Sequence, residues 1–178
     1  MEKMIYLISD TYFGRFTSAK SRNIDPEKHD QELIDNWNSI IKPTDIVWHL
    51  GGFGWDVLST ESVIPKLNGI INIILAPTDE CQKDVFHING IPTHKGYFEL
   101  TGHNVVLSHF PMVNWPGKDE GTALIHGCNK EYKAELHKEF RFNVNCELWS
   151  LGPISLKSLI EVNELINEEN ENVNIKLT

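Results

Sequence analysis

Short apolar runs that stop abruptly constrain this sequence most. One run leads from Met4 to Ser9 and stops at Asp10, a second from Asp45 to Leu50 stops at Gly51-Gly52, and a third covers Ile70 to Leu75. Runs this short and this continuously apolar are typical of strands buried on both faces of a parallel sheet. Because the carboxyl ends of such strands meet at one edge, the segments that follow them predict the place of a functional site.

Helices are predicted between these strands. Asp25 is a suitable N-cap, Pro26 suits the first helical position, and Pro43 ends the pattern. Within that stretch the apolar residues recur at helical spacing: Leu33, Ile34, Trp37, Ile40 and Ile41. A shorter helix is expected between Ser59 and Leu67.

The second half of the sequence places its strands closer together. A hairpin is predicted from residues 98–100 and 105–108, followed by strands over 123–126 and 142–148. An amphipathic helix is expected over 155–166, and residues 167–178 read as a mobile tail or an edge strand. Together these elements predict one α/β domain over residues 1–178, with sheets packed between helices.

Charge and composition restrict the classes of function. The formal net charge is −9, which argues against a general nucleic-acid binder, because phosphate binding depends on clustered Lys and Arg. The three cysteines are widely spaced, and the N-terminus lacks the pattern of a signal peptide. No apolar run approaches the roughly 18 residues of a membrane helix. We expect a cytoplasmic protein that does not interact with membranes.

Several short motifs, in this order and spacing, resemble the calcineurin-like metallophosphoesterase family, especially its small single-domain bacterial and phage members. They are Ile8-Ser9-Asp10-Thr11-Tyr12-Phe13-Gly14, Asn36-Trp37-Asn38, His49-Leu50-Gly51-Gly52-Phe53, Leu67-Asn68-Gly69, Ser108-His109-Phe110-Pro111, Ile125-His126-Gly127 and Asn143-Val144. The resemblance runs from about residue 4 to residue 160 and implies a metallophosphoesterase-like sandwich of two mixed β-sheets flanked by helices.

In that family these loops hold two metal ions, which generate a hydroxide and position a phosphate ester for attack. Of the seven ligand positions that the resemblance implies, Asp10 and His109 keep their ligand. Thr78 stands where the family has an imidazole that assists at the leaving group. The other five ligand positions are changed, and they carry Tyr12, Gly52, Pro77, Cys128 and Lys130.

The changed residues are poor replacements for metal ligands. The phenol of Tyr12 is neutral near pH 7, given a reference pKa of about 10. Gly52 has no side chain to replace the carboxylate that bridges both metals, and Pro77 removes a backbone donor and fixes φ. We therefore expect no cofactor and no two-metal catalysis.

Two alternatives stay open at this site. Asp10, His109 and Cys128 are chemically able to hold one divalent metal such as Mn, Fe or Zn, although the ammonium group of Lys130 would oppose it. Alternatively, Lys130 pairs with Asp10 and supplies the missing positive charge, or it simply points to solvent. Cys128 in turn is equally interpretable as a small, half-buried packing residue.

Trp55 and Trp115 lie in Gly- or Pro-rich loops close to the predicted site. Exposed aromatic side chains often anchor a protein partner, so these two are the candidate partner-binding residues, with structural packing as the alternative. The sequence thus predicts a catalytically inactive protein that binds a protein partner as an inhibitor or decoy, such as a phage protein acting on a host enzyme or defence system. A residual metal-dependent phosphodiesterase or phosphatase, and a nucleotide-binding protein that does not hydrolyse its ligand, are the alternatives.

Overall fold

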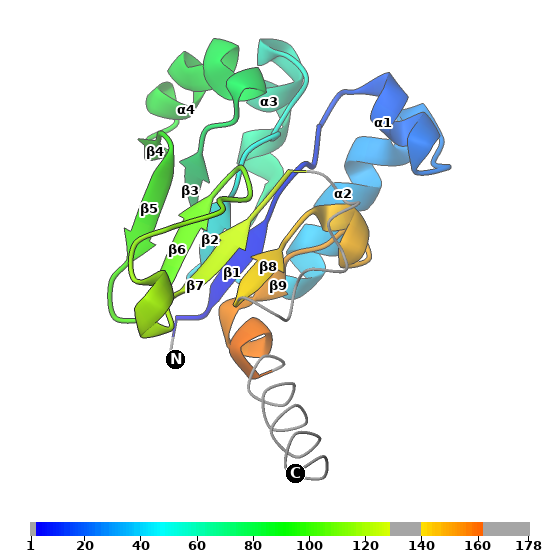
Figure 1. The fold of residues 1–178 in the computed structure, drawn as a ribbon. Helices are drawn as coiled ribbons and strands as arrows, with labels where there is room; N and C mark the ends of the chain where they lie inside the picture. Colours follow the sequence, from blue (N-terminus) through cyan, green and yellow to red (C-terminus); the bar gives the residue numbers. More distant parts are fainter. Residues whose placement is uncertain (1–2, 129–139, 162–178) are drawn as a thin grey trace, which may run out of the picture.

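The computed structural model of the protein describes residues 3–128 and 140–161. It is an α/β structure in which two mixed sheets pack face to face and helices cover the outer face of the first sheet (Figure 1). The predicted sandwich of two mixed sheets flanked by helices is confirmed at this level. No helix in the described ranges is long and apolar enough to cross a membrane.

The first sheet has the strand order β4-β3-β2-β1-β9. Its four parallel strands are β1 (Ile5–Ile8), β2 (Ile46–His49), β3 (Ile70–Ile74) and β4 (Thr93–His94), and β9 (Ile154–Ser155) pairs antiparallel to β1. The three apolar runs of the first half of the sequence are therefore the central strands.

The second sheet has the order β5-β6-β7-β8. A hairpin joins β5 (Tyr97–Leu100) to β6 (Val105–Ser108), and β7 (Ala123–His126) and β8 (Arg141–Asn143) continue it in parallel. The predicted strand over 142–148 is wrong beyond residue 143. There the side chain of Asn145 accepts a hydrogen bond from the Glu147 amide, and Cys146–Leu148 forms a 3₁₀ turn.

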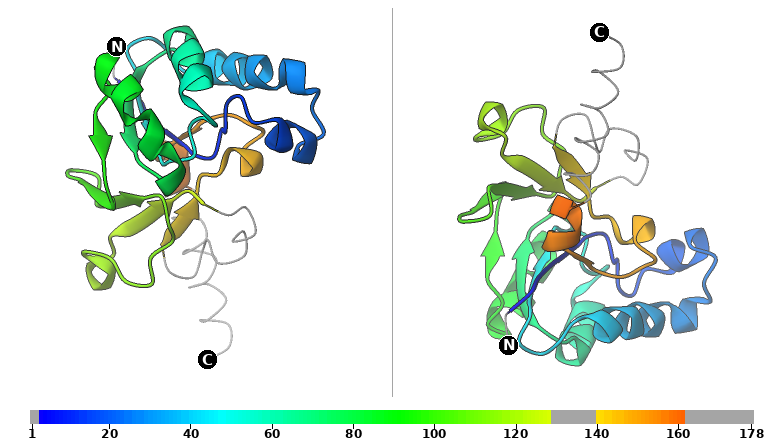
Figure 2. Two further views of the ribbon diagram at one scale, coloured as in Figure 1. Left: turned by 90° about the horizontal axis from the view of Figure 1, so that it is seen from above. Right: turned by 90° about the horizontal axis from the view of Figure 1, so that it is seen from below.

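The helices lie mainly on the outer face of the first sheet (Figure 2). They are α1 (Phe16–Ser21), α2 (Pro26–Ile40), α3 (Val57–Val63) and α4 (Lys83–Ile88). The predicted start of α2 is confirmed, because Asp25 accepts from the Glu27 amide and Pro26 occupies the first turn. Helix α3 begins at Val57, two residues before the predicted start at Ser59, because Asp56 caps it.

Two further segments form helical structure, one after β9 and one after β3. Residues 156–161 are helical, as expected for the start of the amphipathic helix. The rest of that helix and the tail over 167–178 lie outside the described residues. The segment after β3 forms a 3₁₀ helix over Pro77–Gln82, where a loop was expected.

Alternation along the central strands divides the core into two parts. Leu7 and Trp48 face the second sheet and pack near Leu107, whereas Ile8 and Val47 face the helices. Strands with apolar residues on both faces need cover on both faces, and the two-sheet sandwich with outer helices supplies it.

Trp37 is the largest side chain on the helix side of this core. It is fully buried, and its indole nitrogen donates to the Asn68 carbonyl at 2.8 Å. We expect Trp37→Ala to lower the free energy of unfolding by about 3–5 kcal/mol, the usual cost of truncating a buried Trp. Urea denaturation followed by circular dichroism measures this. Glu32→Ala, at an exposed position of the same helix, is the control, and an equal loss in both variants would contradict the prediction.

Candidate functional site

The loops after β1, β2, β6 and β7 meet where the two sheets converge. Ser9, just beyond β1, pairs with the segment after β8: its amide donates to the Val144 carbonyl, and its carbonyl accepts from the Cys146 amide, both at 3.0 Å. Gly127 fits between these loops, since an added Cβ would lie 2.7 Å from the Leu50 carbonyl oxygen and 2.8 Å from the Ser9 Cβ. This contact brings the predicted site residues of both sheets together.

Left-handed backbone conformations gather at the same place. Asp10, Tyr12 and Cys128 have φ values of 57°, 49° and 42°, although none of them is glycine. A non-glycine residue in this region costs of order 1–3 kcal/mol, and such strain is concentrated at functional sites in proteins. The backbone therefore marks the same loops as the sequence motifs did.

The carboxylate of Asp10 is buried and surrounded by hydrogen-bond donors of the protein itself. The Asn145 amide group donates to Oδ2 at 2.9 Å, and the Ser9 hydroxyl donates to it at 3.3 Å. The Tyr12 hydroxyl and the Cys128 backbone amide lie near the carboxylate and favour its charged form. Asn145 was not singled out from the sequence, because no motif of ligand type includes it. Its one sequence signal is its place directly after the Asn143-Val144 motif.

Burial raises the pKa of Asp10 above its ordinary value, outweighing the nearby charge of His109 and the hydrogen bonds that lower it. Burial and the adjacent Asp10 also raise the pKa of Tyr12, so its phenol stays protonated at neutral pH. A protonated phenol is a hydrogen-bond donor and a poor ligand for a cation. Tyr12 thus lies beside the very carboxylate that the resemblance assigns to a metal.

Gly52 is packed against these two residues. An added Cβ would lie 2.6 Å from Asp10 Oδ1 and 3.1 Å from the Tyr12 ring, and the φ of +70° disfavours any L side chain. The volume that a bridging carboxylate would need is therefore filled by Asp10 and Tyr12.

His109 keeps the orientation of a potential ligand. Its Nδ1 donates to the Leu50 carbonyl at 2.7 Å, so Nε2 is the ring nitrogen that this contact leaves available. His49, in contrast, is enclosed in the core: burial, and secondarily the charge of His109, lower its pKa to about 3. Its Nε2 contacts Thr11 Oγ1 at 3.0 Å, so His49 positions the first loop.

The loop after β3 forms a structural cap at the place where the resemblance implies metal ligands. Pro77 and Thr78 are exposed at the start of a 3₁₀ helix. Asp79 is fully buried, and its carboxylate accepts three backbone hydrogen bonds, from Gly52, Phe53 and Ala76, at 2.8 to 2.9 Å. This carboxylate fixes the loops after β2 and β3 together.

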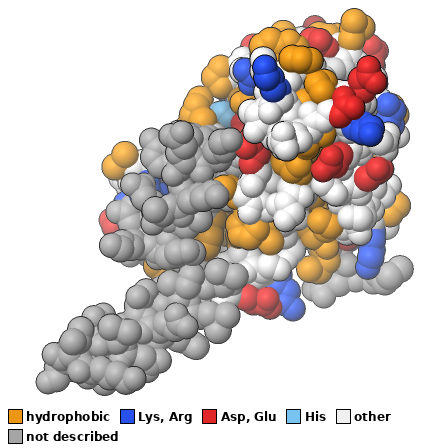
Figure 3. Space-filling view, turned by 90° about the vertical axis from the view of Figure 1, so that its right-hand side faces the viewer, with side chains coloured by type: hydrophobic (Ala, Val, Ile, Leu, Met, Phe, Trp, Pro, Cys, Tyr) orange, Lys and Arg blue, Asp and Glu red, His pale blue; other side chains and the backbone are white. Residues whose placement is uncertain are grey.

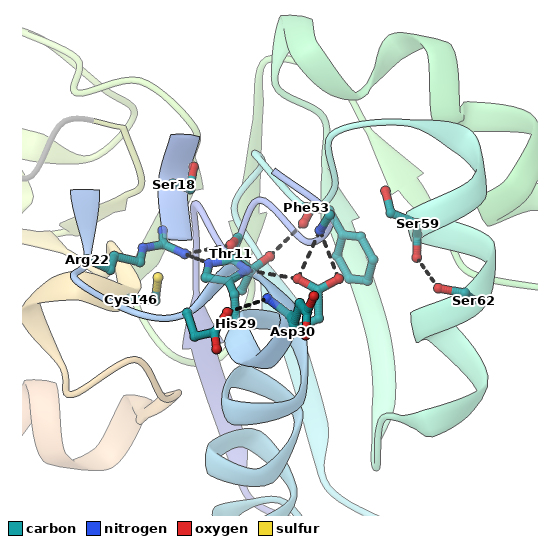
Figure 4. Close-up of polar contacts among 12 residues, drawn as sticks. Thr11, Ser18, Arg22, His29, Asp30, Phe53, Ser59, Ser62 and Cys146 are labelled. Carbon is teal, nitrogen blue, oxygen red and sulfur yellow. Dashed lines mark hydrogen bonds and ion pairs between the residues drawn. The ribbon is translucent and has the colours of Figure 1, made fainter. Parts of the chain in front are cut away.

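A buried arginine holds the first loop from the other side (Figure 4). Arg22, at the end of α1, donates to the carbonyls of Asp10 at 2.6 Å and Thr11 at 2.8 Å. It also donates to His29 Nε2 at 2.8 Å and pairs with Glu147 at 3.3 Å. Since Arg22 only donates, His29 Nε2 must accept, and the proton of the neutral ring lies on Nδ1.

The Nδ1 proton of His29 extends this hydrogen-bond network to the start of α1. His29 Nδ1 donates to Asp30 at 2.8 Å, and both Asp30 oxygens accept from the Gly14 amide at 2.9 Å. The loop from Asp10 to Gly14 is therefore held by α1 and α2 through an arginine, a histidine and a carboxylate. The sequence offered no signal for this network, because its members have no motif spacing.

The predicted site residues are thus brought together in part. Asp10, Tyr12 and Gly52 are in mutual contact, the Cys128 backbone amide lies near Asp10, and the charge of His109 is near enough to influence Asp10. Within residues 3–128 and 140–161, no group of three or more His, Cys, Asp or Glu side chains is placed to hold a metal ion. Lys130 lies outside the described residues, so its pairing with Asp10 stays a prediction.

The two candidate tryptophans differ. Trp55 is 53% exposed, whereas Trp115 is 5% exposed, packs against Val106 and Leu124, and donates from its indole nitrogen to the Thr122 carbonyl at 2.7 Å. The prediction of a partner-binding role is therefore wrong for Trp115, because its ring is buried against the outer face of the second sheet. Trp55 keeps the exposure that such a role requires.

Removing the Asp79 cap should destabilise the protein strongly. Asp79→Ala leaves three buried backbone N–H groups without their acceptor, and each such loss costs about 1–3 kcal/mol. We expect a loss of at least about 3 kcal/mol in the free energy of unfolding, measured by chemical denaturation. Thr78→Ala, at the exposed neighbouring position, should change it little. If Asp79→Ala lowered the free energy of unfolding no more than Thr78→Ala does, the capping role of Asp79 would be ruled out.

The raised pKa of Asp10 predicts a pH dependence. The folded protein holds this proton more tightly than the unfolded chain, so the stability contributed by Asp10 is fully present below pH 3.8 and is lost as the pH rises through its folded pKa. Asp10→Asn removes this titration. The difference in unfolding free energy, wild type minus variant, should therefore fall as the pH rises from about 3 to about 7.

Asp56→Asn provides a control of opposite sign. Hydrogen bonds from Ser59 lower the pKa of Asp56, so its contribution is present above the unfolded pKa and is lost as the pH falls. The corresponding difference should rise over the same interval. Parallel pH trends in the two variants would show that burial does not control the titration of Asp10.

Comparisons with known proteins give relatives of uncharacterised function. No family model matches the sequence. The uncharacterized protein MJ1445 of Methanocaldococcus jannaschii is 26% identical over 174 residues, covering 91% of this chain and 92% of that protein. The Gene 66 protein of Mycobacterium phage L5 is 26% identical over 204 residues, covering 93% of this chain and 95% of that protein.

A solved structure shares the fold. The crystal structure of the protein of unknown function AQ665 from Aquifex aeolicus superposes with a TM-score of 0.72 and 22% sequence identity, covering 90% of this chain and 100% of that one. This chain therefore has an α/β architecture that occurs in another protein over nearly its whole length.

Proposed function

We propose that this chain is a metallophosphoesterase-like protein that has lost two-metal catalysis and acts by binding a protein partner. The proposal rests mainly on the Asp10 carboxylate. Asn145 and Ser9 donate to it, and the Tyr12 hydroxyl and the Cys128 backbone amide lie close enough to lower its pKa. A carboxylate satisfied in this way would have to give up protein hydrogen bonds before it could coordinate a metal.

The residues at the other loop ends do not fit a two-metal cluster. Tyr12 is a protonated donor, Gly52 contributes no side chain, and Pro77 offers no ligand atom. His109 and Asp10 alone leave each of two metals short of ligands, because such clusters need several carboxylate and imidazole donors. Binding to a protein partner accounts better for a rigid site edged by the exposed Trp55.

Hydrolysis of a generic phosphodiester tests the loss of catalysis. Bis(p-nitrophenyl) phosphate is incubated with the protein and excess Mn²⁺, next to the Asp10→Ala and His109→Ala variants. We expect the three proteins to release p-nitrophenol at the same background rate, because none provides a complete pair of metal sites. Turnover in the wild type that both variants abolish would refute the proposal and favour a residual phosphodiesterase.

Affinity purification from the native host tests the binding half of the proposal. The tagged full chain should retain one host protein in stoichiometric amount. Stabilisation of the chain by a nucleotide, measured as a rise in Tm without hydrolysis, would instead favour a nucleotide-binding function.

A further inference from the structure

Arg15 has an unusual environment beside the candidate site. Its guanidinium carbon lies 4.9 Å from the centre of the Tyr12 ring and 4.7 Å from that of Trp55. Its Nε is buried and has no hydrogen-bond partner, and its guanidinium makes no ion pair with any residue in the described ranges. In a protein of net charge −9, this cation is held by aromatic rings instead of by a carboxylate.

Two carboxylates beside these loops form hydrogen bonds with other groups. Asp30 accepts from the Gly14 amide and from His29, and Asp56 accepts from the Ser59 amide at the start of α3. Both therefore stabilise backbone conformations of the two loops that carry Arg15 and Trp55. The lack of a counter-ion for Arg15 is a property of this arrangement.

Exposed apolar side chains lie on the same two segments as Arg15. Besides Trp55 they include Phe16, 64% exposed, and Leu58, 76% exposed. The Trp55 amide donates to the Phe13 carbonyl at 2.8 Å, which holds the two segments side by side. On the face that Figure 3 shows, hydrophobic side chains lie beside both basic and acidic ones.

We propose that Tyr12, Arg15, Trp55, Phe16 and Leu58 form a docking surface for a protein segment that presents one carboxylate next to an apolar side chain. The partner's Asp or Glu would pair with the guanidinium, whose planar fork matches a carboxylate. The partner's apolar side chain would cover Trp55 and Leu58. This inference rests on the proposed binding function and names the chemistry of the partner.

Charge limits the partner further. A net charge of −9 repels a strongly acidic protein at long range, so the segment must carry its carboxylate in a neutral or basic context. At physiological ionic strength the screening length is about 8 Å, so the strength of a direct contact with Arg15 depends mainly on the groups next to it. Arg, Tyr and Trp are also the side chains most enriched among residues that dominate binding energy.

Peptide selection tests this surface. Random peptides displayed on phage are selected on the immobilised full chain, and a synthetic copy of the best sequence is labelled for fluorescence anisotropy. We expect the selected peptides to share a Glu or Asp beside an aromatic or aliphatic residue. Arg15→Gln or Trp55→Ala should each weaken binding at least about tenfold, because each removes half of the contact.

A double substitution identifies the pairing itself. Replacing the acidic residue of the peptide by its amide should weaken binding to the wild type about tenfold but leave binding to Arg15→Gln unchanged. Ile70→Thr, at an exposed apolar position on the opposite end of the sheet, is the matched control and should bind like the wild type. The circular dichroism spectrum of each variant verifies folding.

Other results would overturn the inference in distinguishable ways. Selected peptides that lack an acidic residue, or that bind Arg15→Gln as well as the wild type, would show that the surface does not recognise a carboxylate. Competition by inorganic phosphate or AMP that depends on Arg15 would assign the surface to a small anion. In each case the phosphodiester assay still tests the loss of catalysis separately, since none of its variants changes Arg15.

Discussion

The contact between the two sheets at Gly127 is the constraint on which the site depends. Only a residue without a side chain fits against the Leu50 carbonyl and Ser9, and this fit lets the ends of β1, β2 and β7 approach each other. The polar groups of Ser9 then hydrogen-bond to the segment after β8 instead of to water. As a result, loops that are far apart in the sequence supply side chains to one small volume.

The same convergence explains why strained residues persist there. Left-handed backbone at Asp10, Tyr12 and Cys128 is unfavourable for each residue, but the loop is held by groups that are themselves fixed. Arg22 binds the Asp10 and Thr11 carbonyls, and Asp79 binds the amides of the loops after β2 and β3. Side chains of the protein therefore supply charges and hydrogen-bond donors and acceptors that hold these loops in place.

The sequence predicted the architecture well because its signals were local. Apolar runs located the central strands, and the Asp25-Pro26 pair located the start of α2. Prediction failed where a single side chain decides the conformation, as Asn145 does after β8 and Asp56 does before α3. Such hydrogen bonds leave no periodic pattern in the sequence.

The site was predictable in position but not in its contacts. The order of the motifs placed Asp10 and Gly52 at the carboxyl ends of neighbouring parallel strands of the first sheet, and His109 at the end of a strand of the second. It could not show that Tyr12 turns back onto Asp10, since that depends on backbone dihedrals at both residues. Nor could it separate Trp55 from Trp115, because both follow similar loops and only packing against the second sheet buries the latter.

The packing around Gly52 has a consequence for how this protein can change over evolution. A carboxylate introduced at this position alone would collide with Asp10 and Tyr12 and would require an unfavourable backbone conformation. The Asp10 side chain, 2.6 Å from the added Cβ, and the Tyr12 ring, 3.1 Å from it, would both have to move first. A single substitution at position 52 therefore does not yield a carboxylate free to bind a metal, and the change that makes room for it brings no catalytic gain on which selection could act.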